Sequence, residues 1–269
     1  MTPAKRAIRI AFGNQKGGVG KTLVCAACAH AAAAAGFEVL VVDADPQGNI
    51  TSALTSYSDA QPPPASLADV LDRRANVDLL DAVIPTRREA ISLLSSGFDE
   101  LQAVQDSLVG KPGSEHSIAR ALRDADGRWD FVFIDTRPAT DLITRNALMA
   151  ADQLIVVVQP EQFAIAGLQA TLNAVDELAD YLDKKLPVAG WVLNLIDSRR
   201  LDHAENLQNL RSQAAAEGIP ILGELTGSAD LARLSVVGMG ADEHPKPTPR
   251  IRNYANDFAS IIQQLTHPA

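Results

Sequence analysis

The sequence lacks the features of membrane and secreted proteins. It has no run of about 18 apolar residues, the length that a membrane-spanning helix needs. Its first residues, Met1 to Arg6, contain no apolar signal-peptide core. We therefore expect a cytoplasmic chain that does not bind a membrane. With 269 residues, 46% of them hydrophobic, the chain is long enough for one large α/β domain over residues 1–269.

Cysteine is also scarce, and its arrangement excludes a metal centre of the zinc-ribbon kind. Cys25 and Cys28 form a C-x-x-C pair, but no second pair exists to complete a four-ligand site. The two residues lie in a predicted helix, three positions apart and on one face. We expect them to pack as small hydrophobic side chains.

Positive charge is the third deficit. The chain has 24 lysines and arginines against 33 acidic residues, a net charge of −9, and its isoelectric point is near 5.0. Non-specific binding to nucleic acid depends on phosphate electrostatics and requires a basic patch. The overall composition does not favour a nucleic-acid partner, so any such patch must be local.

A glycine-rich segment is the most informative feature that the sequence does contain. The segment GNQKGGVGKT, residues 13–22, follows an apolar run at 8–12 and precedes a helical run at 23–35. Glycines let backbone N–H groups approach phosphate oxygens, and the helix start adds its positive dipole. Lys21 is expected to contact the β- and γ-phosphates, and the Thr22 hydroxyl to bind Mg²⁺. The expected nucleotide-binding residues here are Gly17, Gly18, Val19, Gly20, Lys21, Thr22 and Leu23.

A second lysine in this loop carries a family resemblance. The segment KGGVGKT, residues 16–22, resembles the deviant Walker A motif of the ParA/MinD group of ATPases. In that group the extra lysine reaches across a nucleotide-sandwich dimer to the phosphates held by the other subunit. The resemblance implies an ATP-dependent homodimer in which Lys16 stabilises the transferring phosphoryl group in trans. The alternative is that Lys16 is a solvated loop charge.

Two carboxylates follow the strand predicted at residues 38–42. The segment DADPQGN, residues 43–49, places them at the carboxyl end of a buried strand, where open α/β sheets carry ligand chemistry. It resembles the switch segment of the ParA branch. The resemblance implies that Asp45 activates the attacking water and that Asp43 helps to hold the magnesium shell. Alternatively, both carboxylates could cap the next helix.

An apolar strand that ends in an acid forms the third motif. The segment WDFVFID, residues 129–135, matches a Walker B strand, and Asp135 is expected to contact Mg²⁺ through water. The family usually continues with two prolines, whereas this chain has Arg137 in place of the first. Arg137 therefore adds a charge to the switch region.

The rest of the chain alternates between strand and helix patterns, without a linker long enough to divide it. We expect a single doubly wound, mostly parallel sheet with helices on both faces, a P-loop NTPase fold. Asn194, at the end of a predicted strand, resembles the adenine-contacting residue of related ATPases, with a turn role as the alternative. Strands are also expected at 91–95, 154–158, 188–195 and 219–222, and helices at 67–74, 98–109, 117–125, 161–182, 202–217 and 253–265.

DNA binding by this chain has weaker support than nucleotide binding. Partition ATPases of the resembled type bind DNA without sequence preference, often through a proline-arginine segment after the last short strand. Here Gly227 and Asp230 stand where arginines often stand. Each nearby arginine could be an ordinary surface charge, and together they could form a replacement patch. The DNA-binding candidates are Arg199, Arg200, Arg211, Arg233, Arg250 and Arg252.

The resemblance implies a ParA-like partition ATPase that is associated with the nucleoid. An ATP- and Mg²⁺-dependent dimer would bind DNA, and a ParB-like centromere-binding partner would stimulate slow hydrolysis and release it. The cargo would be a plasmid, phage or chromosomal replicon. One alternative is a ParA-like positioner of a protein cargo. The other is a metabolic P-loop enzyme, against which the D-P-Q-G-N segment argues. The predicted end helix at 253–265 has no lysine or arginine, unlike the basic membrane helix of MinD-type relatives.

Overall fold

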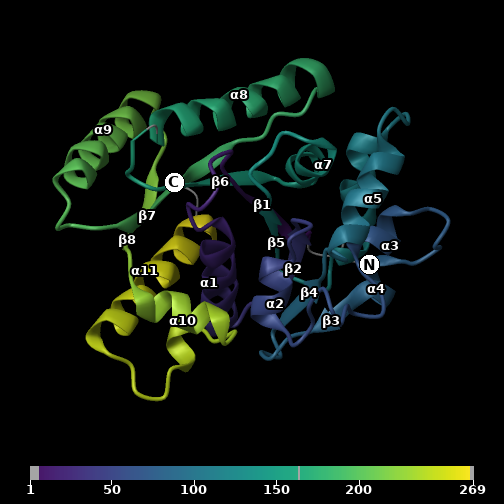
Figure 1. Ribbon diagram of the computed structural model, residues 1–269, viewed down its shortest axis with the longest axis horizontal. Helices are drawn as coiled ribbons and strands as arrows, with labels where there is room; N and C mark the ends of the chain where they lie inside the picture. The colour runs from purple at the N-terminus through teal and green to yellow at the C-terminus, as the bar shows by residue number, and fades with distance from the viewer. Residues whose placement is uncertain (1–5, 163, 267–269) are drawn as a thin grey trace.

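One eight-stranded sheet forms the centre of the molecule. The computed structural model describes residues 6–162 and 164–266, and its strand order is β3-β4-β2-β5-β1-β6-β7-β8 (Figure 1). All neighbouring strands are parallel except the edge strand β3, which runs antiparallel to β4. The strands are β1 (Ile8–Gly13), β2 (Val39–Ala44), β3 (Val83–Pro85), β4 (Ile91–Leu94), β5 (Phe131–Thr136), β6 (Gln153–Val158), β7 (Val188–Ile196) and β8 (Ile221–Thr226).

Helices cover both faces of this sheet. One face carries α1 (Lys21–Ala34), α2 (Asn49–Leu54), α10 (Ala229–Val236) and α11 (Pro249–Thr266). The other carries α3 (Leu67–Leu71), α4 (Leu79–Ala82), α5 (Asp99–Leu108), α6 (Ser117–Ala121), α7 (Leu142–Ala150), α8 (Ala164–Leu182) and α9 (Leu201–Glu217). Short 3₁₀ turns are η1 (Ser114–His116), η2 (Leu122–Ala125) and η3 (Ala241–Glu243). The expected doubly wound, mostly parallel fold is confirmed.

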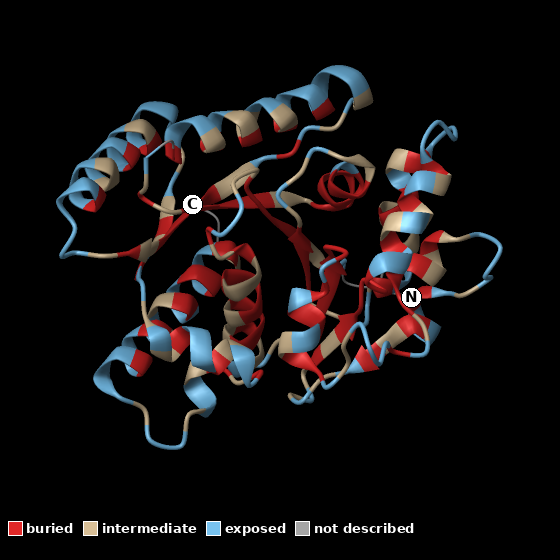
Figure 2. Cartoon of the chain, in the orientation of Figure 1, coloured by how far each residue is buried: buried red, intermediate tan, exposed pale blue. Residues whose placement is uncertain are grey.

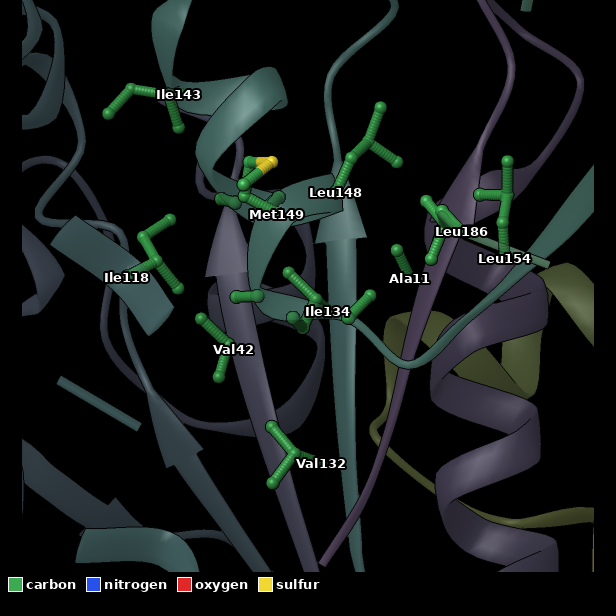
Figure 3. Packing of buried hydrophobic residues seen from close by; sticks show 14 of the residues in the cluster. Ala11, Val42, Ile118, Val132, Ile134, Ile143, Leu148, Met149, Leu154 and Leu186 are labelled. Atoms are coloured by element: carbon green, nitrogen blue, oxygen red, sulfur yellow. The ribbon is translucent and has the colours of Figure 1, made fainter. Parts of the chain in front are cut away.

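The central strands are buried on both sides, as parallel strands between helix layers must be. Alternate residues of β5 divide between the two cores: Val132 and Ile134 face α7, while Phe131 and Phe133 face α1. Figure 2 shows the strands buried while the outer sides of α8 and α9 are exposed. In Figure 3, Met149 of α7 lies above the end of the strand that carries Val42, next to the strand that carries Ile134.

Elements in several parts of the chain differ from the sequence-based expectation. The strand expected at 219–222 is β8, residues 221–226, and the helix α10 after it was not predicted. Gly223 interrupts the apolar pattern of β8 and lies close to α11, because a Cβ there would come within 3.0 Å of Ile261 Cδ1. The region expected as one helix at 117–125 divides into α6 and η2.

Two expectations about apolar side chains are confirmed. Cys25 and Cys28 are free and fully buried in α1, and burial raises the pKa of both thiols. Phe258 and Ile261 of α11 are buried against the domain. No helix in the described part of the chain is long and apolar enough to cross a membrane.

Candidate nucleotide-binding site

The three predicted motifs meet at the carboxyl ends of β1, β2 and β5. These strands are neighbours in the sheet, and Asp43 at the end of β2 pairs directly with Asp135 at the end of β5. The glycine-rich segment, residues 13–22, leaves the end of β1 beside them, and we call it the phosphate loop. Parallel strands bring their carboxyl ends to one edge, so residues about 90 positions apart in the sequence form one site.

The loop has the backbone conformation of an anion-binding turn. Gly18 and Gly20 have φ values of 78° and 86°, in the left-handed region that favours glycine. Gly20 stands directly before α1, whose first residue is Lys21. Residues 17–20 lie outside helix and strand, in the turn that leads into α1. Backbone N–H groups of this turn and the helix dipole can bind phosphate oxygens.

Lys21 lies inside this site, with 6% of its surface exposed. Desolvation lowers the pKa of its ammonium group, and the carboxylates of Asp135 and Asp45 act in the opposite direction. A buried ammonium between carboxylates and backbone N–H groups is suited to a multiply charged phosphate chain. The side chain of Leu23 instead lines a small hollow between α1, α10 and α11, so Leu23 can offer a phosphate only its backbone.

Asp135 has the surroundings of a metal ligand. It is fully buried, and neither of its oxygens makes a hydrogen bond of normal geometry with a described residue. Burial raises its pKa to about 8, the charge of Asp43 adds to this rise, and the nearby Thr22 hydroxyl opposes it. Magnesium prefers carboxylate, hydroxyl and water oxygens. Asp135 and Thr22 therefore fit a hydrated Mg²⁺, whose charge would stabilise the ionised carboxylate.

Asp43, unlike Asp135, accepts hydrogen bonds from the protein with both carboxylate oxygens. Its Oδ1 accepts from Asp45 N at 3.1 Å, and its Oδ2 accepts from Thr51 N at 3.2 Å and Thr51 Oγ1 at 2.6 Å. Burial raises its pKa to about 7 against these bonds. Asp43 thus supports the switch segment and the first turn of α2, as the capping alternative expects. Direct contact with a metal would require it to give up one of these bonds.

Asp45 is placed at the open side of the same edge. Its Oδ1 accepts from Gln47 N at 3.0 Å, and its residue surface is 8% exposed. It lines a hollow of about 360 Å³ with Gln47 and Arg137. The space beside this carboxylate could accept an attacking water, the role that the resemblance assigns to Asp45.

Asn194 braces the phosphate loop. Its Nδ2 donates to Val19 O at 2.9 Å, and a Cβ on Gly20 would come within 2.4 Å of the same nitrogen. Sequence reasoning missed a second brace, Asn14, whose Nδ2 donates to Val157 O at 2.7 Å and whose Oδ1 accepts from Lys16 N at 2.8 Å. An asparagine directly after the strand-ending Gly13 was the available signal.

Lys16 pairs with a carboxylate outside the three motifs. Its Nζ lies 2.9 Å from Glu161 Oε2, and the two side chains are 28% and 34% exposed. The hydrogen bond from Lys16 lowers the pKa of Glu161. Glu161 was missed as a partner because it lies 145 positions away, after β6. Solvent screens a partly exposed ion pair, so Lys16 can exchange this partner for another anion.

The six DNA-binding candidates differ in their surroundings. Carboxylates hold three of them: Arg199 is paired with Asp197, Arg200 with Asp202 and Arg211 with Glu224. Arg252 Nη1 donates to Pro247 O at 2.8 Å. Arg233 and Arg250 have no carboxylate within 4.0 Å in the part of the chain that the structure covers. The six come from α9, α10, α11 and the turn before α9, and half of them are already neutralised.

Comparison with known proteins gives the same assignment for most of the chain. Residues 7–188 match the AAA domain family. The chain is 35% identical to the sporulation initiation inhibitor protein Soj of Bacillus subtilis over 191 residues, 71% of this chain and 73% of Soj. It is 34% identical to the chromosome partitioning protein ParA of Caulobacter vibrioides over 71% of this chain and 70% of that protein. An uncharacterized Mycobacterium tuberculosis protein is 34% identical, and the match spans 60% of its length.

Solved structures share the complete architecture. A cobyrinic acid a,c-diamide synthase from Mycobacterium smegmatis, with bound ATP analogue and magnesium, has a TM-score of 0.80 and 26% identity over 98% of this chain and 97% of the other. The ATP complex of a single-residue variant of Cyanothece McdA has a TM-score of 0.84 over 98% of both chains, and at 20% identity it supports the fold alone. With its phosphate loop, acidic strand ends and matching relatives, the chain belongs to the ParA/MinD family of P-loop ATPases.

Proposed function

We propose that this protein is a partition ATPase that binds ATP and Mg²⁺ at the carboxyl ends of β1, β2 and β5. The loop N–H groups and Lys21 bind the phosphates, while Thr22 and Asp135 hold the ion. Magnesium neutralises the developing phosphate charge. Asp45 orients water in the hollow beside it, and Asn14 and Asn194 fix the loop.

The contrast between the two loop lysines carries this proposal. Lys21 is buried in its own site, whereas the Lys16 side chain is 28% exposed and paired with Glu161. A loop cation that is partly exposed can contact phosphates held by a second copy of the chain. ATP would thus stabilise a dimer, and hydrolysis would release it.

We further propose that the dimer binds duplex DNA through the ends of α10 and α11. Arg233 and Arg250 are exposed without a close carboxylate among the described residues, and Arg252 is exposed two positions after Arg250. The pairs at Arg199, Arg200 and Arg211 reduce their attraction for phosphate. A ParB-like protein would stimulate hydrolysis, and the cargo would be a replicon, with localisation in the cytoplasm at the nucleoid.

The test is binding to random-sequence duplex DNA with ATP and with ADP across a salt series, for the natural protein and Lys16→Ala. The proposal expects binding that needs ATP, weakens with salt and is lost in Lys16→Ala. If the protein forms ATP-dependent dimers that do not bind DNA, the alternative function, positioning of a protein cargo, replaces DNA partition. If ATP hydrolysis depends on an added carboxylate substrate and an amide donor, the protein is instead an amide-forming enzyme, like the diamide synthase named for the M. smegmatis neighbour.

A further inference from the structure

An arginine beside the switch segment is not explained by the proposed function. Arg137 follows β5 at a position where the resembled motif has proline. Its side chain is 29% exposed, and its Nη1 donates to Gln102 Oε1 at 2.9 Å and lies 3.1 Å from Asp141 Oδ2. Gln102 belongs to α5, and Asp141 caps α7 through Thr144 N. The guanidinium therefore connects the loop after β5 to two helices.

The backbone around Arg137 is held in place. Thr136 Oγ1 donates to Phe12 O at 2.7 Å, and Ala139 N donates to Arg137 O at 2.9 Å. Pro138 restricts the residue before it to extended conformations. The base of the Arg137 side chain is thus fixed, and the rotational freedom lies in its long arm.

Arg137 lines the same hollow of about 360 Å³ as Asp45. Asp45 and Gln47 come from the switch segment, and Asp99 and Gln102 come from α5. This hollow adjoins the phosphate loop, because Pro138 in its wall lies 3.8 Å from the place of a Cβ on Gly17. Space beside Gly17 and Asp45 is the space into which the end of a phosphate chain would project.

The hollow is lined by two acidic residues and one arginine. Asp45 and Asp99 are acidic, and among the described lining residues Arg137 supplies the positive charge. A phosphate group near two carboxylates is repelled unless a cation offsets them. A guanidinium offers paired N–H donors that match phosphate oxygens.

We propose that Arg137 makes nucleotide binding depend on the third phosphate. Its guanidinium attracts the γ-phosphate of ATP, which ADP lacks, in competition with Asp141 and within its own subunit. The inference rests on the proposed ATPase function, and it adds a second cation, in cis, to the trans lysine Lys16. Arg137 is then the residue through which the site distinguishes ATP from ADP.

The test measures the Kd of ADP and of a non-hydrolysable ATP analogue by calorimetry with Mg²⁺. In Arg137→Ala the preference for the ATP analogue should fall by about tenfold while the ADP affinity stays within about twofold. Arg137→Lys should restore part of the preference because it keeps the charge. Asp141→Asn keeps a capping side chain but frees the guanidinium, and it should raise the preference about threefold.

Arg145→Ala is the matched control, because Arg145 is an exposed arginine on α7 that does not line this hollow. The series is repeated in a Lys16→Ala background, where an unchanged effect of Arg137→Ala confirms action within one subunit. An unchanged preference in Arg137→Ala, or an equal loss of ADP and ATP affinity, would overturn the inference and leave the ATPase proposal intact. If the natural protein binds neither nucleotide, both proposals fail. Should Arg137→Ala not fold, Asp141→Asn and Arg137→Lys decide the question alone.

Discussion

Charged residues behave differently at two ends of this molecule. At the carboxyl ends of β2 and β5, Asp43 and Asp135 are fully buried, and Asp135 has no regular hydrogen bond within the described chain. Around α9 and β8, Arg199 and Arg211 are exposed, and each is matched by a carboxylate. Burial makes an unmatched charge unfavourable, so such a carboxyl group holds its proton until a ligand supplies a cationic partner. Exposed charges pair with nearby carboxylates, and these pairs add little stability.

Among the predictions that test this comparison, the removal of Lys21 should have the largest effect, which is on ATP binding. Lys21→Ala deletes the buried cation between Asp135 and Asp45, and the Kd for ATP should rise at least about 100-fold. Isothermal calorimetry with Mg²⁺ measures this change. Lys185→Ala, which removes an exposed lysine, is the control and should leave the Kd unchanged. If the Kd of Lys21→Ala rises by less than about tenfold, the buried position of Lys21 does not give it a special role in ATP binding.

The buried carboxylate Asp135 should destabilise the metal-free protein as the pH rises. Its pKa is 3.8 in an ordinary setting and about 8 in the fold. Below about pH 4 it is protonated in both folded and unfolded chains, and between about pH 4 and pH 8 only the unfolded chain releases the proton. The free energy of unfolding should therefore fall across this window.

Asp135→Asn removes the contribution of Asp135 and leaves the smaller one of Asp43, whose pKa is also raised, and in EDTA at pH 8 its Tm should exceed that of the natural protein by roughly 5 °C. Thermal unfolding followed by circular dichroism at several pH values measures it. Added Mg²⁺ should reverse the order, because the ion stabilises the carboxylate and not the amide. Asp78→Asn, at an exposed aspartate, is the control. A natural protein whose Tm rises steadily from pH 5 to pH 8, in step with Asp135→Asn, would contradict the prediction.

Asn194 distinguishes bracing of the loop from contact with adenine. Asn194→Ala leaves Val19 O without its donor, so binding of ATP, ADP and tripolyphosphate should weaken alike, by about tenfold. Competition calorimetry with the three ligands measures this. Unchanged binding of tripolyphosphate, which has no base, would instead assign Asn194 to adenine. Asn173→Ala, at an exposed asparagine on α8, should change none of the three.

The smallest effect should come from the exposed pair on α9 and β8. Arg211→Ala breaks two hydrogen bonds to Glu224, yet the Tm should move by less than about 2 °C, because surface ion pairs add little stability. Differential scanning calorimetry measures this shift. A decrease above about 5 °C would mean that exposed pairs hold this edge of the sheet.

The sequence by itself determined the fold class and the phosphate-binding chemistry. Glycines at 18 and 20 are local requirements of a left-handed turn, and the apolar strands that end in Asp43 and Asp135 are local patterns. Such signals need no distant partner, so they can be read along the chain. The last strand of the sheet was harder to predict, because Gly223 in β8 lies close to Ile261 on α11, a contact that only folding creates.

The tertiary structure alone decided how the charges are used. Lys16 meets Glu161 across 145 positions, and Asn194 meets Val19 across 175. Arg137 is an unexpected residue in the sequence, and its place between Gln102, Asp141 and the hollow at Asp45 follows from the packing of α5 and α7. A charge has no pattern of its own in the sequence, because its burial and its partners come from elements that are far apart in the chain.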